Sequence, residues 1–97
     1  MSRPAVDDLI ALLDRLDPIE LRRGGAPIGE YSAEARTILP RLVEAASAED
    51  VMRVVHEEFV RWFDPGIAGP IEDYRAASRA IWDWWRRRSK ERGSDYE

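Results

Sequence analysis

The sequence predicts an all-α fold: a compact four-helix bundle with one long packed loop at about residues 18–31. Three observations carry this prediction. Apolar residues recur at helical spacing in separate stretches, capping residues precede several of these stretches, and no stretch alternates as a strand would. With 97 residues, 44% hydrophobic and 35% charged, the chain is expected to form a single helical domain over residues 1–97.

The first helix is predicted over residues 4–17, where Pro4 suits a first turn and Pro18 disfavours helical geometry at the residue before it. Residues 18–31 contain three glycines and two prolines, which exclude a regular helix. The same stretch is too apolar for a solvated linker, so it is expected to pack on the bundle. Its expected anchors are Ile19, Leu21, Ile28 and Tyr31.

The second helix is predicted over residues 32–46, with Ser32 as its cap. Pro40 lies inside it and removes one backbone hydrogen bond, so the helix either bends or splits there. The third helix is predicted over 47–63. Ser47 is its expected N-cap, with an acid three residues on. Its expected buried face consists of Val51, Val55, Phe59 and Trp62.

The last helix is predicted over residues 70–90, after the breaking sequence at 64–66, and residues 93–97 are expected to fray. Its apolar stripe contains one small polar residue, Ser78. A single serine is tolerable in this stripe, because its hydroxyl can bond back to a backbone carbonyl one turn earlier.

The composition makes some classes of function less favourable, but it specifies no chemical reaction. The net charge of −4 argues against nucleic acid as the main partner and suits another protein, in particular a cationic one. The chain has no cysteine, no apolar run long enough for a membrane span and no signal-peptide pattern at its start. A cytoplasmic protein without a cofactor is the simplest interpretation.

His56 is the only histidine, so a histidine-based metal site is not expected. The sequence offers His56 no obvious nucleophile or orienting partner, and we therefore predict no catalytic residue. The alternative is a small-ligand binder or enzyme that uses His56 with Glu57 or Glu58 beneath the loop at 18–31.

Glu58 falls by helical angle inside the apolar face of the third helix. A carboxylate in that position needs a hydrogen-bonding partner, because an unpaired buried charge is costly. Arg22 or Arg23 of the loop could supply the partner and so fasten the loop to the bundle. The other interpretation is a rim position, exposed at the end of the bundle.

Trp82 and Trp84 lie to either side of the central stripe of the last helix, so one neighbouring helix cannot bury both. Either they wedge between two other helices, or one is partly exposed and anchors a partner. In the second case the partner-binding surface is expected to combine that tryptophan with Glu30 and Tyr31.

The one basic cluster comprises residues 86–88, Lys90 and Arg92. Basic segments can bind nucleic acid, which is a further alternative for this end of the last helix. Cations also compensate the dipole at a helix C-terminus, and nearby acids dilute the cluster, so dipole compensation explains it better.

Part of the chain resembles the YugE-like family, small bacterial helical domains of unknown function. The likeness is carried by the segments 17–19 (Asp-Pro-Ile), 25–27 (Gly-Ala-Pro) and 30–31 (Glu-Tyr), followed by Glu34 and Ile38. The chain departs from the family pattern at Gly29 and at residues 32–33. The resemblance implies a helical fold and brings no activity, cofactor or catalytic residue.

The sequence therefore predicts a small non-catalytic protein-interaction module. A fainter likeness of type, to small acidic four-helix proteins that neutralise bacterial toxins, suggests an immunity or antitoxin factor as one form of this function.

Overall fold

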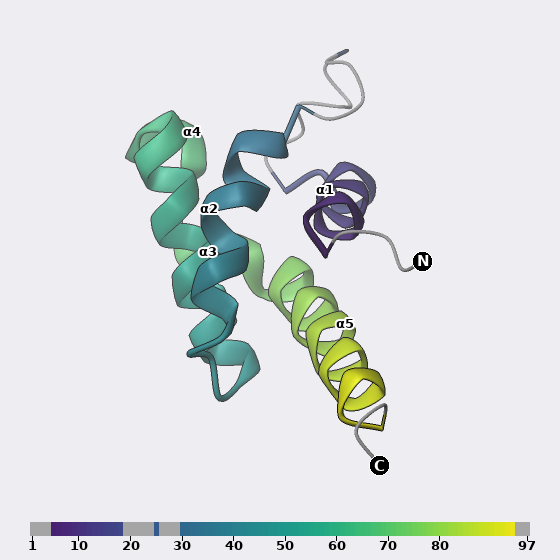
Figure 1. Ribbon diagram of the computed structural model, residues 1–97. Coiled ribbons are helices and arrows are strands. Elements are labelled where there is room, and N and C mark those ends of the chain that lie inside the picture. Colours follow the sequence, from purple (N-terminus) through teal and green to yellow (C-terminus); the bar gives the residue numbers. More distant parts are fainter. Residues whose placement is uncertain (1–4, 19–24, 26–29, 95–97) are drawn as a thin grey trace.

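The computed structural model describes residues 5–18, 25 and 30–94, with side chains as far as residue 88. Within these residues every regular element is helical and no strand is present, which confirms the all-α prediction (Figure 1). The elements are α1 (Ala5–Leu16), α2 (Ser32–Leu42), α3 (Ala48–Phe63), α4 (Pro65–Ala68), the 3-10 helix η1 (Ile71–Tyr74) and α5 (Arg75–Ser94).

The third helix of the prediction, α3, is the centre of the packing. It contacts α2, α4, η1 and α5, whereas α1 contacts α2 and α5. Figure 1 shows α2 and α3 side by side, with α5 running from their middle toward the C-terminus. The molecule measures 47 × 27 × 19 Å along its principal axes. The longest helix is α5, whose 20 residues span about 30 Å.

A single apolar core joins these helices. Its buried hydrophobic members are Leu9, Leu12 and Leu13 of α1, Tyr31 just before α2, Ala35, Ile38 and Leu42 of α2, Val51, Val54, Val55 and Phe59 of α3, Ala68 of α4, Tyr74 of η1, and Ile81 of α5. On α1, α2 and α3 the members recur at three- and four-residue spacing, as one face of a helix requires, whereas α5 contributes Ile81 alone. The core thus faces inward from every long helix.

The start of α3 confirms the predicted cap. Ser47 has extended backbone geometry, and its hydroxyl accepts the backbone N–H of Asp50 at 3.2 Å. The Asp50 carboxylate in turn accepts the backbone N–H of Ala46 at 2.8 Å. These bonds satisfy two backbone donors at the boundary, so α3 begins where the sequence indicates.

The second helix ends earlier than predicted, at Leu42 instead of residue 46. Beyond it the backbone N–H groups of Glu44 and Ala45 bond to carbonyls three residues back, which tightens the chain into a turn. Asp50 then takes the N–H of Ala46 and fixes the turn against α3. Pro40 does not split α2, which is continuous on both sides of it.

The chain between α3 and α5 is more helical than predicted. Asp64 adopts a left-handed φ of 76°, and its side chain caps α4 at the N–H of Ile67, 2.9 Å away. Gly69 then turns the chain with a φ of 76° and a ψ of −178°, a combination that essentially only glycine adopts. The predicted last helix therefore begins with the 3-10 turn η1, and α5 continues past residue 90 to Ser94. The predicted frayed tail overlaps α5 at residues 93–94.

The loop at 18–31 was expected to pack on the bundle through four apolar anchors. Three of them, Ile19, Leu21 and Ile28, lie outside the described residues, as do Arg22 and Arg23. The fourth, Tyr31, is fully buried in the core.

Candidate functional site

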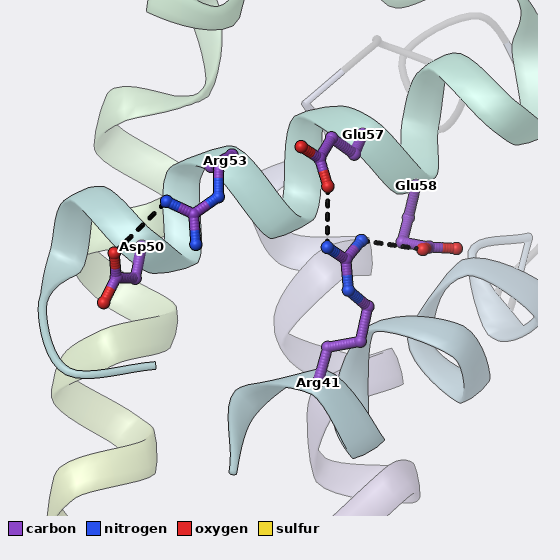
Figure 2. A network of polar contacts seen from close by, with 5 residues as sticks. All are labelled: Arg41, Asp50, Arg53, Glu57 and Glu58. Carbon is purple, nitrogen blue, oxygen red and sulfur yellow. Dashed lines mark hydrogen bonds and ion pairs between the residues drawn. The ribbon is translucent and has the colours of Figure 1, made fainter. Parts of the chain in front are cut away.

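Arg41 of α2 holds two neighbouring carboxylates of α3 (Figure 2). Its Nη1 lies 2.9 Å from Oε2 of Glu58, and its Nη2 lies 2.6 Å from Oε1 of Glu57. The pKa of Arg41 is raised, mainly by the hydrogen bond with Glu57 and to a smaller extent by the one with Glu58. Partial burial acts in the opposite direction and lowers it. The guanidinium therefore stays charged and ties α2 to α3.

The structure gives Glu58 a partner on α2. The side chain is buried, 6% exposed, as its helical angle suggested, so the rim interpretation is wrong. Its partner among the described residues is Arg41, whereas Arg22 and Arg23, the predicted partners, lie outside the described residues. The sequence contained a signal for this pairing, since Arg41 lies three residues after the inward-facing Ile38 and directly before the inward-facing Leu42. The pairing of α2 with α3 could not be read from that spacing alone.

A second carboxylate, Glu34 at the start of α2, is also buried. Its Oε2 has no hydrogen-bond partner among the described residues. Burial raises the pKa of Glu34, opposed by a bond to its own backbone and assisted by the charge of Glu30. The sequence does not mark Glu34 as buried, because an acid in a first helical turn is expected on dipole grounds.

His56 lies apart from the carboxylates of α3. Its Nε2 donates to the carbonyl of Gly69 at 2.9 Å, and its ring is tilted by 58° against that of Tyr74, with centroids 5.5 Å apart. Glu57 and Glu58, by contrast, reach α2 through Arg41. Among the described residues, His56 is therefore hydrogen-bonded to neither Glu57 nor Glu58, one of which the enzymatic alternative pairs with it beneath the loop at 18–31.

Tyr74, whose ring contacts that of His56, also bonds to a backbone carbonyl at the end of α4. Its phenol donates a hydrogen bond of 2.5 Å to the carbonyl of Ala68, and burial, with a smaller effect of Asp73, raises its pKa to about 12. With His56 bonded to Gly69, the two side chains hold both carbonyls at the end of α4. This geometry fixes the turn between α4 and η1.

Of the tryptophans, Trp62 lies in a different environment from the one predicted. Trp82 and Trp84 are half-buried and pack against the core. Trp62, predicted as a core residue, is 47% exposed. That prediction is wrong because near the end of α3 the ring meets the side of α2, where its Nε1 donates to Oγ1 of Thr37 at 3.1 Å. The Thr37 hydroxyl itself donates to the carbonyl of Glu34 at 3.1 Å, so the indole has a fixed orientation.

Two further partner-binding candidates have opposite environments. Glu30 is exposed and available to a partner. Tyr31 is fully buried, its ring tilted against Phe59 with centroids 5.7 Å apart. The predicted contact of Tyr31 with a partner is therefore wrong. Its burial agrees instead with its other predicted role, as an apolar anchor of the loop at 18–31.

The basic end of α5 is partly engaged within the molecule. The Arg86 guanidinium lies over the Trp82 ring, 5.7 Å from its centroid, and Arg88 lies 3.4 Å from Asp8 of α1. Arg87 is exposed. These contacts involve only part of the predicted cluster, since the side chains beyond residue 88, including Lys90 and Arg92, lie outside those described.

Among the described helices, none is both long enough and apolar enough to cross a lipid bilayer. Comparison of the chain with models of protein families, with curated proteins and with solved structures found no match.

Proposed function

We propose that this chain is a small non-catalytic protein-interaction module, and that neutralising a toxin, as an immunity or antitoxin factor does, is the form of this function to test first. The observation that carries the proposal is Trp62. Nearly half of its side chain is in solvent, yet its indole is held in one orientation by Thr37. Fixed, partly exposed tryptophans are typical anchors of protein interfaces, because little side-chain entropy is lost on binding.

The charge around this anchor favours a cationic partner. Trp62 lies one turn beyond Glu58 on α3, beside the cluster of Arg41, Glu57 and Glu58, whose net charge is −1. The Glu57 side chain is half exposed and can contact a partner. The whole chain carries −4, which would steer a basic protein toward it.

The competing functions have weaker support. Enzymatic use of His56 lacks the neighbouring carboxylates it would require, because Glu57 and Glu58 contact α2. Nucleic-acid binding through the end of α5 would have to overcome the negative net charge, and part of that basic cluster already contacts Trp82 and Asp8. The resemblance to the YugE-like family remains a hypothesis that is compatible with a binding module and adds no activity.

The test begins with capture of a partner from extracts of the source organism, using the full chain as bait. The recombinant partner is then titrated calorimetrically with the wild-type chain and with Trp62→Ala and Ile67→Ala. Ile67 is the matched control, because it is also a large, exposed apolar side chain. We expect Trp62→Ala to weaken binding at least about tenfold, as loss of an anchor does, and Ile67→Ala to change it little.

A partner that binds Trp62→Ala as tightly as the wild type would contradict the proposed surface. Absence of any protein partner, together with a small molecule retained through purification, would favour the ligand-binding alternative. Binding that collapses steeply with salt and requires nucleic acid would favour the basic end of α5.

A further inference from the structure

A pocket of about 520 Å³ lies between α1 and α5. Its lining residues fall within positions 8–15 of α1 and 80–87 of α5. On each helix they follow the spacing i, i+3, i+4 and i+7, so each set forms one face of its helix. The volume lies in the range of roughly 300–1,000 Å³ that is usual for small-molecule sites. Two helix faces therefore border a space large enough for a small organic ligand.

The apolar part of the lining consists of one large ring and three smaller side chains. Trp84 is half-buried and packs against the core, and Leu12 is buried, with 7% exposure. Ala11 and Ala80 contribute only a methyl group each, so neither helix fills the space with a bulky side chain at these positions. A flat apolar group can therefore lie against the indole of Trp84 and leave water.

Three hydrogen-bond donors of the lining have no partner among the described residues. They are the indole N–H of Trp84 and the guanidiniums of Arg15 and Arg87, both of which are exposed. A tryptophan N–H usually finds a partner when it is buried, as that of Trp62 does in Thr37. None of the three groups can accept a hydrogen bond. The lining therefore offers donors from both helices, and these suit an anionic acceptor.

Two aspartates limit how much negative charge the pocket accepts. Asp8 is already engaged, because Nη1 of Arg88 lies 3.4 Å from its Oδ2. Asp83 makes no ion pair with any described residue, so two arginines and one aspartate leave a local net charge of +1. A single carboxylate neutralises this charge, whereas a second negative charge would meet the repulsion of Asp83 without a further cation to balance it.

We propose that this pocket binds a small aromatic monocarboxylate. The ring of the ligand lies against the indole of Trp84, and the flexible side chains of Arg15 and Arg87 approach its carboxylate from α1 and α5. The two arginines repel a cationic ligand, and an uncharged one gains little from them. The site lies on α1 and α5, whereas the proposed interaction surface around Trp62 lies on α2 and α3, so neither depends on the other.

The test is a titration of the ¹⁵N-labelled full chain, at constant ionic strength, with four matched probes. Naphthoate has the ring and the carboxylate, naphthalenemethanol lacks the charge, naphthylmethylamine reverses it, and acetate lacks the ring. The readout is the NMR shift of the Trp84 indole N–H, assigned by its loss in Trp84→Phe. We expect saturable shifts with naphthoate and binding at least about tenfold weaker for the other three probes, because each lacks the charged hydrogen bond or the ring contact.

The variants Arg15→Gln and Arg87→Gln should each weaken naphthoate binding about threefold to fivefold, as expected for an exposed ion pair. Ala11→Leu fills the pocket from an exposed position of α1, so it should leave the fold intact and weaken binding at least about tenfold. Arg79→Gln is the matched control. It removes the same charge from an exposed position of α5 outside this pocket and should leave binding unchanged.

Four results would each overturn the proposal. They are the absence of saturable shifts with naphthoate, equal binding of any of the other three probes, naphthoate binding that survives Ala11→Leu and both pocket arginine variants, and a loss with Arg79→Gln as large as with Arg87→Gln. The last result would attribute the attraction to the overall charge of α5 and not to the pocket.

Discussion

The phenol of Tyr31, at the N-cap of α2, donates a hydrogen bond of 2.6 Å to Oδ1 of Asp17, the residue that follows α1. The two residues are 14 positions apart in sequence and bring the end of α1 to the start of α2. Asp17 adopts a left-handed φ of 49°, a conformation that aspartate tolerates better than most residues. One contact thus closes the longest connection between two helices of the chain.

We expect Tyr31→Phe to lower the free energy of unfolding by about 1–2 kcal/mol, because it removes this bond while keeping the ring in the core. Asp17→Asn is the matched variant. It keeps an acceptor for the phenol and tolerates the same backbone geometry, so it should cost less. Urea denaturation of both variants provides the measurement. Equal losses would show that the charge of Asp17 matters more than its bond with Tyr31.

Phe59 and Trp62 lie three residues apart on α3 and should respond very differently to truncation. Phe59 is fully buried, so Phe59→Ala should cost about 3–5 kcal/mol. Trp62→Ala should cost less than about 1 kcal/mol, because the ring is 47% exposed and makes one surface hydrogen bond. Chemical denaturation of the pair checks both values, and a large loss for Trp62→Ala would place its ring in the core after all.

Removal of the Arg41 side chain should lower the free energy of unfolding mainly because Glu58 then lacks its partner. Arg41→Ala leaves the Glu58 carboxylate buried without its partner and should cost about 1–2 kcal/mol, a value reduced because Arg41 itself is 35% exposed. The control is Glu57→Gln, which weakens only the half-exposed ion pair and should cost less than about 0.5 kcal/mol. If thermal unfolding shows equal losses, the burial of Glu58 is not what makes Arg41 important.

Glu34 should make stability depend on pH. Burial raises its pKa above the ordinary 4.5, so the folded chain holds this proton more tightly than the unfolded chain does. The stability that the protonated form contributes is fully present below pH 4.5 and is lost as the pH rises through the raised pKa. Glu34→Gln cannot ionise and should therefore be more stable than the wild type at pH 7.

The advantage of Glu34→Gln should shrink as the pH falls to 4, where the wild-type carboxyl is protonated in both states. Denaturation midpoints at pH 4 and pH 7 for both chains provide the comparison. If Glu34→Gln is more stable than the wild type by the same amount at both pH values, its effect comes from packing of the amide and not from the charge of Glu34.

The sequence by itself determined the helical class and where most helices begin. Both are local properties. The spacing of apolar residues selects a helix over a strand, and Ser47 needs only the nearby amide of Asp50 to cap α3. The inward angle of Glu58 was predictable for the same reason, because the geometry of one helix fixes which residues share a face.

Only the tertiary structure decided which neighbouring element lies against each helix face. Trp62 shares the angle of Val51 on α3, yet Val51 is buried and Trp62 is half exposed, because different elements lie opposite the two ends of the helix. The partner of Glu58 is Arg41, and Ser78 lacks the backbone bond that its position allowed. Helical periodicity gives the direction in which a side chain points from its helix. Whether that side chain is buried, and which partner it bonds to, depends on how far the neighbouring helices extend and on where along their length they cross.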